Sequence, residues 1–374
     1  MPRLHTRATI GGLAIVLAAC AAAPAAAGNG PVRPQEAPVY AYVCSQDEAM
    51  ITVIDLTTQR VVEEIHLTEL GFTPNAKPHH VAVEPDGSFW YVSLIGENRV
   101  LKFDRDNTLV GRVDFEVPGM LALDADADML FAGRSMSAVN PPARLGEFST
   151  DGMRADEVDV FFPRPHALAL SPDGARIYTA SLAENQLATV DRETGDVELT
   201  NVDQGGHGAH GEHGHMIAHF GIAPDGDLLV ATTEMTGLLL FFDLSGDGLP
   251  KADGQMELGQ RPWLPVFSPD GGTLYLAVKD ANAVDIIDVA SRQVRTRITH
   301  PAISEPHGAA LSPDGRWLIV TNNNTKGAYA STRRSEKGGG PVGTAVIIDT
   351  GSNEVVEVIE VGANPTGVGV RPGA

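Results

Sequence analysis

The sequence predicts an all-β chain folded as a seven-bladed β-propeller. The main observation is a repeated phrase, an apolar alternating strand followed by a Pro-Asp-Gly turn, which recurs at a propeller-like spacing of roughly 40 to 60 residues. The clear copies of this turn begin at Pro85, Pro172, Pro224, Pro269 and Pro313. Two degenerate copies, at 121–128 and 368–373, complete a set of seven. Each phrase is followed by three more short strand patterns, so we expect four strands per blade.

The two ends of the chain predict how the ring closes. Residues 39–67 have the pattern of the second, third and fourth strands of a blade, with no first strand before them. Residues 364–372 have the pattern of a first strand with nothing after it. We therefore expect the C-terminal strand to complete the N-terminal blade, which removes exposed sheet edges.

Backbone geometry accounts for the residues of the repeated turn. Pro presets φ at the second turn position, and Gly tolerates the positive φ that such turns require. The acidic residues between them are therefore interpreted as turn residues and not as catalytic acids: Asp86, Asp173, Asp225, Asp270 and Asp314.

The repeats resemble the YVTN family of bacterial β-propeller repeats. Residues 164–174, for example, run Arg-Pro-His-Ala-Leu-Ala-Leu-Ser-Pro-Asp-Gly. The resemblance covers nearly all of the chain after residue 37. It implies a propeller fold and an extracytoplasmic location, but no single activity, because members of the family share none.

The N-terminal residues predict export. Arg3 and Arg7 precede an apolar run at 10–19 and small residues through 27, the pattern of a signal peptide over 1–27. A linker over 28–37 and the propeller over 38–374 would follow. Two processing routes are open: a lipobox ending at Cys20, which would anchor the protein to a membrane by lipid, or ordinary cleavage after Ala27. Either route predicts a periplasmic or secreted protein.

Charge and cysteine content exclude several classes of partner and cofactor. The formal net charge of −21 argues against nucleic acid and anionic membrane surfaces as partners. Cys44 is the only cysteine besides Cys20, so the mature chain can form no internal disulfide. The sequence contains no c-type haem Cys-x-x-Cys-His motif and no nucleotide-binding motif.

Histidines recur where the inner strand of each blade begins. Because this strand lines the central channel of a propeller, its first residues should lie at one mouth of the channel. Counting back from each turn Pro places five histidines there: His79, His80, His166, His219 and His307. Trp263 stands at an equivalent position and could stack on a bound ligand.

Loops should surround the same mouth. Strand direction brings the fourth-to-first and second-to-third loops to this face, including the long insertions at 71–78, 205–215 and 325–341. The second-to-third loops should place acidic and Met side chains at the rim: Asp47, Glu97, Glu184, Glu234, Met235 and Asp280. Asn322 and Asn323 end a second strand and could hydrogen-bond a ligand. The 205–215 segment adds His207, His210, His213 and His215.

Convergent imidazoles predict a transition metal, copper or zinc, at the mouth. Their arrangement resembles the histidine cluster at the propeller hub of nitrous oxide reductase. The chain departs from it, because no copper-binding electron-transfer domain follows the propeller and the positions of Gly119, Trp263 and Thr366 lack histidine. An alternative is that the imidazoles hydrogen-bond backbone groups around the channel, since Pro-His is common in YVTN repeats.

Three functions follow from these observations. The first is an extracytoplasmic binding protein that holds a metal or a small ligand at the mouth. The second is an enzyme, a metal-dependent oxidoreductase or a lactonase-like hydrolase, since propellers of related sequence include both; no nucleophile motif is present. The third is a platform for a protein partner without a small-molecule site.

Overall fold

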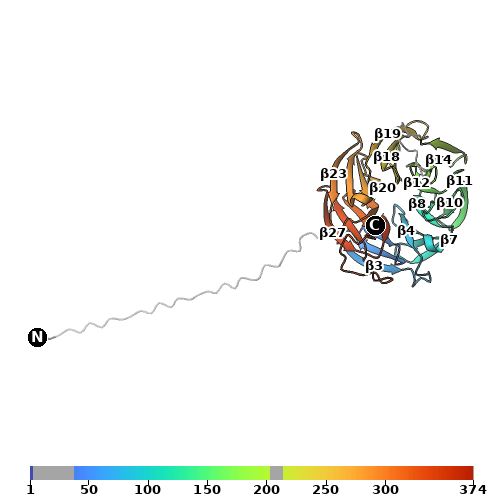
Figure 1. Cartoon of the computed structure of the whole chain (residues 1–374). Helices are drawn as coiled ribbons and strands as arrows, with labels where there is room; N and C mark the ends of the chain where they lie inside the picture. The colour runs from blue at the N-terminus through green and yellow to red at the C-terminus, as the bar shows by residue number, and fades with distance from the viewer. Residues whose placement is uncertain (3–37, 203–213, 374) are drawn as a thin grey trace. The chain divides into compact units, whose positions relative to one another are not determined.

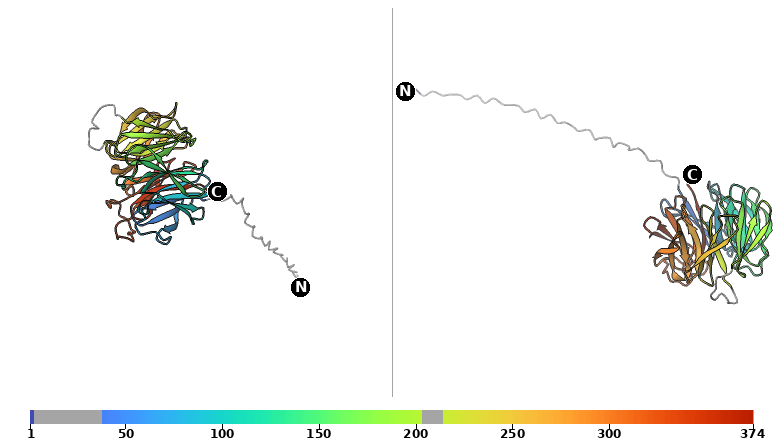
Figure 2. Two further views of the ribbon diagram at one scale, coloured as in Figure 1. Left: turned by 90° about the vertical axis from the view of Figure 1, so that its right-hand side faces the viewer. Right: turned by 90° about the horizontal axis from the view of Figure 1, so that it is seen from above.

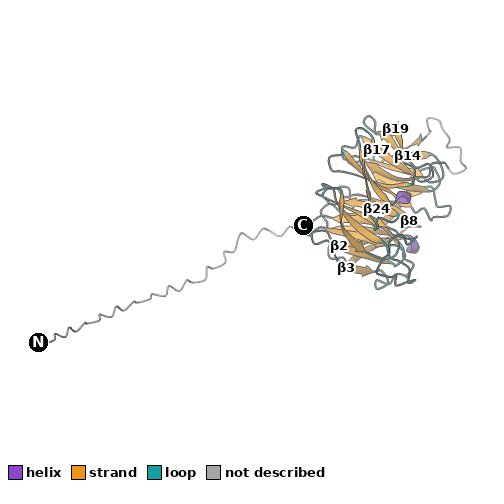
Figure 3. Cartoon of the chain, turned by 60° about the vertical axis from the view of Figure 1, so that its left-hand side comes forward, coloured by secondary structure: helices purple, strands orange, loops and turns teal. Residues whose placement is uncertain are grey.

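Strand pairing divides the chain into seven four-stranded antiparallel sheets. This is seen in a computed structural model that describes residues 1–2, 38–202 and 214–373. The sheets are the blades of a propeller arranged around a central channel (Figure 1), so the predicted fold is confirmed. Regular structure in the described residues is strand apart from two single turns of 3₁₀ helix, η1 (Ile95–Glu97) and η2 (Lys279–Ala281) (Figure 3). No helix among them has the length and apolarity to cross a membrane.

The blades share one order of strands from the channel outward. The inner strands are β28 (Pro365–Arg371), β4 (Pro78–Val83), β8 (Pro118–Asp124), β12 (Pro165–Leu170), β16 (Ile217–Ile222), β20 (Pro262–Phe267) and β24 (Pro306–Leu311). The second strands are β1 (Tyr40–Ser45), β5 (Phe89–Leu94), β9 (Met129–Arg134), β13 (Arg176–Ser181), β17 (Leu228–Thr233), β21 (Thr273–Val278) and β25 (Trp317–Asn322).

Two further strands complete each blade towards the outside. The third strands are β2 (Met50–Asp55), β6 (Arg99–Asp104), β10 (Arg144–Ser149), β14 (Gln186–Asp191), β18 (Leu238–Asp243), β22 (Ala283–Asp288) and β26 (Thr344–Asp349). The outer strands are β3 (Arg60–His66), β7 (Leu109–Asp114), β11 (Arg154–Asp159), β15 (Val197–Asn201), β19 (Lys251–Glu257), β23 (Gln293–Thr299) and β27 (Glu354–Glu360). Figure 2 shows the blades from two other sides.

The hydrophobic core lies between neighbouring blades. The second and third strands are almost fully buried, because a blade covers each of their faces, whereas outer strands such as β11 are exposed. One aromatic stack illustrates the packing: the ring of Trp90 lies 4.4 Å from that of Tyr42 in the preceding blade and 4.2 Å from that of Phe103. Blade-to-blade burial of this kind supplies most of the stabilisation in the absence of a disulfide within the described residues.

The ring closes through the two ends of the chain. The C-terminal strand β28 pairs antiparallel with β1, with Tyr40 opposite Arg371 and Val43 opposite Val368. The predicted closure is therefore confirmed. Cys44 lies in β1 at this junction, is fully buried and carries a free thiol whose pKa is raised by burial.

The long loop 325–341 is held in place by carboxylates. Glu305 accepts a hydrogen bond from the N–H of Lys326, and Glu360 accepts one from the N–H of Arg333. Glu48, in the N-terminal blade, accepts one from the N–H of Glu336. The loop therefore links the last blade to the first on the side of the closing strand.

Inner strands approach one another so closely that some positions admit only glycine. A Cβ at Gly367 of β28 would lie 2.3 Å from the carbonyl oxygen of His79 and 2.7 Å from the Cα of His80 in β4.

We expect Gly367→Ala to lower the free energy of unfolding by about 1–3 kcal/mol, because the backbone must move to make room for the added methyl group. Urea unfolding tests this against Gly338→Ala, where nothing lies within 4 Å of the added methyl. Equal stability of the two variants would contradict the expectation.

Candidate functional site

A cavity of about 290 Å³ opens at one mouth of the channel, and all seven blades contribute to it. We call it the mouth cavity. Its walls are formed by Gln46, Lys77, His79, Ile95, Ser135, Met136, Ser137, His166, His219, Glu234, Trp263, Lys279, His307, Asn323, Asn364 and Thr366. Three repeated backbone features place these residues.

The first feature is a bulge near the start of every inner strand. Between β4 and β5, Pro78 pairs with Leu94 and Val81 with Val92, so two residues face one across the ladder. Equivalent register shifts occur in the other six blades. Bulges re-aim side chains and are frequent next to active sites. Here they release His79 and His80 from regular pairing.

The second feature is a left-handed residue immediately before every inner strand. The seven non-glycine residues with φ between 47° and 57° at this point are Lys77, Val117, Arg164, Met216, Arg261, Glu305 and Asn364. Such conformations are unfavourable for residues with a Cβ and tend to gather at functional sites. The mouth is therefore the place where backbone strain recurs in every blade.

The third feature is a hydrogen bond that restrains each left-handed residue. Its carbonyl accepts the N–H of the residue directly after the second strand, as in Ile95 to Lys77 at 3.1 Å and Lys279 to Arg261 at 2.9 Å. The seven donors are Gln46, Ile95, Ser135, Leu182, Glu234, Lys279 and Asn323. Six of these seven residues line the mouth cavity. One repeated bond thus positions most of the loop side chains of the site.

Four of the five predicted ring histidines line the mouth cavity. His166 and His219 form one pair, with ring centroids 5.7 Å apart, and His79 and His307 form another at 6.1 Å. Trp263 lies between the pairs, 5.0 Å from His219 and 5.2 Å from His307. The site is an arc of aromatic rings and not five imidazoles meeting at a point.

The fifth histidine, His80, lies one step deeper in the channel. It lines a narrow space of about 10 Å³ beneath the mouth cavity, together with His79, His219 and His307. Its Nδ1 accepts the N–H of Leu121 in the next blade at 3.3 Å. The bulge causes this separation, because it places the consecutive residues His79 and His80 at different depths of the channel.

Hydrogen bonds fix which nitrogens of the rings carry protons. Nδ1 of His79 donates to Oε1 of Gln46 at 3.0 Å, and Nδ1 of His166 donates to the carbonyl of Arg134 at 2.7 Å. Each ring therefore keeps a lone pair on Nε2. The ammonium of Lys279 donates to Nδ1 of His307 at 3.0 Å, which leaves Nε2–H as the donor of that ring. The mouth offers both donors and acceptors.

Several buried polar atoms in this wall have no partner within the protein. They are Nε2 of His166, both ring nitrogens of His219 and Nε1 of Trp263, in residues that are at most 3% exposed. These are four of the twelve such atoms in the described part of the chain. Leaving a buried donor or acceptor unsatisfied costs about 1–3 kcal/mol. These four atoms therefore lower the free energy of unfolding of the protein when no ligand satisfies them.

The imidazoles of the channel are neutral at neutral pH. Burial lowers the pKa of His79 to about 3 and those of His80 and His166 to about 4, and neighbouring imidazoles or Lys279 add to the effect for His79. Burial also holds the pKa values of His219 and His307 well below their ordinary value. No proton therefore competes for their lone pairs near pH 7.

Charged side chains lie beside the arc formed by the four imidazoles and the indole of Trp263. The Nζ of Lys279 lies 4.6 Å from the ring centroid of Trp263, and burial together with nearby Arg261 lowers its pKa to about 8. Glu234, as predicted from its loop, lines the cavity, where it pairs with Arg261 at 3.1 Å. Asn323 also lines the cavity, and its side-chain amide donates to the carbonyl of Pro365 at 2.6 Å.

Other predicted residues lie away from the mouth cavity. Met235 is 54% exposed outside it, because the loop turns outward after Glu234. Asn322 is fully buried and donates to the carbonyl of Val320 within its own sheet. Glu97 accepts hydrogen bonds from Thr73.

The remaining predicted residues lie in the 205–215 segment and at the N-terminus. His215 is buried, with Nδ1 2.9 Å from the hydroxyl of Thr236. The other candidates lie outside the described residues, namely His207, His210, His213, the signal peptide 1–27 with Cys20 apart from residues 1–2, and the whole linker 28–37.

The described side chains do not form a ready metal centre. Among residues 38–202 and 214–373, no group of three or more His, Cys, Asp or Glu side chains is arranged to hold a metal ion. The indole of Trp263 lies between His219 and His307, and three of the four Nδ1 atoms at the mouth are engaged by protein groups. Copper or zinc at these histidines stays a prediction.

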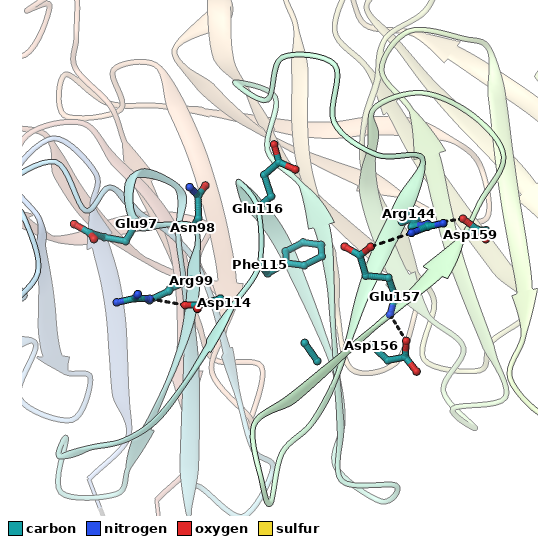
Figure 4. A pocket seen from close by; sticks show the side chains of 11 residues that line it. Glu97, Asn98, Arg99, Asp114, Phe115, Glu116, Arg144, Asp156, Glu157 and Asp159 are labelled. Carbon is teal, nitrogen blue, oxygen red and sulfur yellow. Dashed lines mark hydrogen bonds and ion pairs between the residues drawn. The ribbon is translucent and has the colours of Figure 1, made fainter.

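A larger hollow of about 830 Å³ lies between the blades of β4–β7 and β8–β11. Both of its arginines are paired: Arg144 pairs with Asp159 and Glu157, and Arg99 pairs with Asp114 (Figure 4). Unlike the mouth cavity, its lining contains none of the buried unpartnered atoms found in the described residues. The mouth cavity is therefore the stronger candidate site.

Sequence reasoning missed Gln46, Lys77, Ile95, Lys279, Asn364 and the 135–137 turn. For the residues that follow a second strand, a signal existed: the donor of the repeated bond is always the first residue after that strand. Asp47 and Asp280 were expected at the rim instead. Each of them follows by one position the residue that lines the cavity, Gln46 or Lys279.

The low pKa of His166 predicts acid sensitivity. In the unfolded chain this imidazole takes up a proton as the pH falls from 7 to 5, whereas in the folded chain, with a pKa of about 4, it stays neutral. Stability is therefore lost as the pH falls, by about 2 kcal/mol for this residue. We expect His166→Gln, which can still donate to Arg134, to lose about that much less between pH 7 and pH 5 in urea unfolding. His66→Gln, outside the cavity, is the control; unchanged pH dependence in His166→Gln would refute the assignment.

Solved structures support the fold. Hydrazine synthase of Kuenenia stuttgartiensis superimposes with a TM-score of 0.62 at 18% identity, covering 78% of this chain and 88% of that one. A functionally unknown protein from Desulfotomaculum acetoxidans gives 0.67 at 13% identity, covering 90% and 99%. Streptogramin B lyase gives 0.61 at 15% identity, covering 77% and 91%. Identities this low show a shared fold only.

Sequence comparisons identify the family. Human WD repeat-containing protein 36 is 29% identical over 175 residues, which are 46% of this chain and 19% of that protein. Antigen Lp49 of Leptospira interrogans is 31% identical over 99 residues, 26% of this chain and 21% of that protein. These matches span about a fifth of each relative. The model of the family described as lactonase, 7-bladed beta-propeller, matches residues 110–326, more than half of the chain. The chain therefore belongs to the lactonase family of seven-bladed β-propellers.

Proposed function

We propose that the protein is an extracytoplasmic binding protein that holds a small molecule in the mouth cavity. The observation that carries this proposal is the set of buried polar atoms without protein partners on His166, His219 and Trp263. The cavity volume of about 290 Å³ lies at the small end of the range for ligand sites, about 300–1,000 Å³. The YVTN-like repeats and the signal pattern over 1–27 support a location outside the cytoplasm.

A purely structural role does not account for the composition of this wall. Apolar side chains of similar size would fill the same space without the penalty of unsatisfied polar groups. The inner strands offer such side chains elsewhere, for example Leu121 and Leu168. A ligand with its own donors and acceptors would satisfy the polar atoms of the mouth and offset their cost. Ligand binding therefore accounts for the polar side chains of this wall, which packing alone does not explain.

Acid–base strength favours binding over hydrolysis. A general base works best when its pKa lies near the operating pH. The imidazoles here have pKa values of about 3 to 4 where a value is resolved, so they are weak bases for activating water on a lactone ring. Lactone hydrolysis, the activity that the family description names, is thus the less favoured use of this site.

A transition metal is the second candidate ligand. The specific observation in its favour is that the imidazoles are neutral at pH 7, so their lone pairs are available to copper or zinc. As arranged, His166 and His219 would supply a pair of ligands, and among the described residues no third His, Cys, Asp or Glu is placed to complete a metal site with them.

His219→Leu separates a functional from a structural histidine. Because the change removes two unpartnered buried nitrogens, we expect the free energy of unfolding to rise by about 1 kcal/mol. We also expect ligand-observed NMR to show that small aromatic and polar fragments which bind the wild-type protein no longer bind. The matched control is Thr179→Val, which removes an unpartnered buried hydroxyl outside the cavity and should leave binding intact. A destabilised His219→Leu variant, or a wild type that binds no fragment, would contradict the proposal.

Elemental analysis tests the metal alternative. Tag-free protein and a His166→Gln/His219→Leu variant should contain the same small amount of copper and zinc if the cavity serves a small molecule. About one equivalent of either metal in the wild type, lost in the variant, would instead make the mouth a metal site.

A further inference from the structure

The mouth cavity contains a lysine without a counter-ion. Lys279 begins η2, directly after β21, and its ammonium contacts two neutral groups, Nδ1 of His307 and the face of Trp263. Among the described residues it makes no ion pair with a carboxylate, although fifteen ion pairs occur there. Partly buried cations are normally paired, since burial without a partner is unfavourable.

The nearby carboxylates are engaged by other residues. Glu234 pairs with Arg261 at 3.1 Å, and Asp280 lies between Arg261 and Lys326 at 3.8 Å from each. Glu305 accepts hydrogen bonds from Thr325 and from the backbone of Lys326, which fixes it on the loop side. All three raise the pKa of Lys279 through space, but none of them forms an ion pair with its ammonium.

The same wall has a second cation and an unused donor. Lys77 lines the cavity and, within the described part of the chain, also makes no ion pair. The buried indole N–H of Trp263 has no acceptor. The lining thus contains two lysines, Lys77 and Lys279, and one carboxylate, Glu234, which is already paired with Arg261.

We infer that the ligand of the mouth cavity is a small organic acid, whose carboxylate is the counter-ion of Lys279 and whose body packs on Ile95 and Met136. This inference rests on the proposed binding function and names its ligand class. A single ammonium, here 4.6 Å from the ring centroid of Trp263, suits a singly charged carboxylate. A phosphate, with its greater charge, usually takes an arginine fork or a row of backbone N–H groups, and Lys279 starts only a single turn of 3₁₀ helix.

Paired acids and amides of equal shape test the inference. Isothermal titration calorimetry or ligand-observed NMR at pH 7 with benzoate against benzamide, and acetate against acetamide, isolates the charge. We expect at least one acid to bind about tenfold or more tightly than its amide. Lys279→Gln should remove that preference, so that each acid and its amide bind within about twofold of one another. Lys326→Gln, an already paired lysine outside the cavity, should change acid affinity less than about twofold.

The outcomes separate this inference from the proposed function. Amides or other neutral fragments that bind as well as their acids would overturn the carboxylate assignment and leave binding intact. An acid preference that survives in Lys279→Gln would overturn the role of Lys279. Tighter binding of inorganic phosphate than of either acid would overturn the ligand class. Absence of any binding in the wild type would overturn both proposals.

Discussion

One hydrogen bond, repeated in every blade, organises the mouth of this propeller. It joins the carbonyl of a left-handed residue before the inner strand to the N–H of the first residue after the second strand. The bond compensates an unfavourable backbone conformation, and it holds two loops of each blade against the channel. Because it uses only backbone atoms, it leaves the side chains at both positions free to vary. The same frame can therefore carry Lys77 and Ile95 in one blade and Arg261 and Lys279 in another.

This frame depends on closure of the ring. Each inner strand packs against the two inner strands beside it, which help to set its position, and the pairing of β28 with β1 completes the ring. The closing strand also supplies Asn364 and Thr366 to the mouth cavity, and Thr366 hydrogen-bonds the carbonyl of His79. The stability of the closed ring thus bears on the geometry of the site, and the strained and unsatisfied groups there persist because the surrounding blades are well packed.

Much of this arrangement could be predicted from the sequence, for identifiable reasons. The Pro-Asp-Gly turns fix the phase of each blade, so counting back from them placed His79, His166 and His307 at the mouth. Counting could not show that His80 faces a deeper level, because a bulge breaks the alternation of side chains. Lys279 was missed because its importance depends on which carboxylates are already paired. Such pairing is a property of three-dimensional neighbours that no single repeat contains.

The reactivity of the fully buried thiol of Cys44 reports on the motions of the strands around it. Cys44 is the only cysteine in the described residues and lies in β1, the strand that β28 must leave if the ring opens. A thiol that is buried and has a raised pKa reacts with reagents only after the surrounding strands separate. The rate of Cys44 modification in the native protein therefore measures how often the strands around it separate, and a ligand that joins blades across the mouth would slow it.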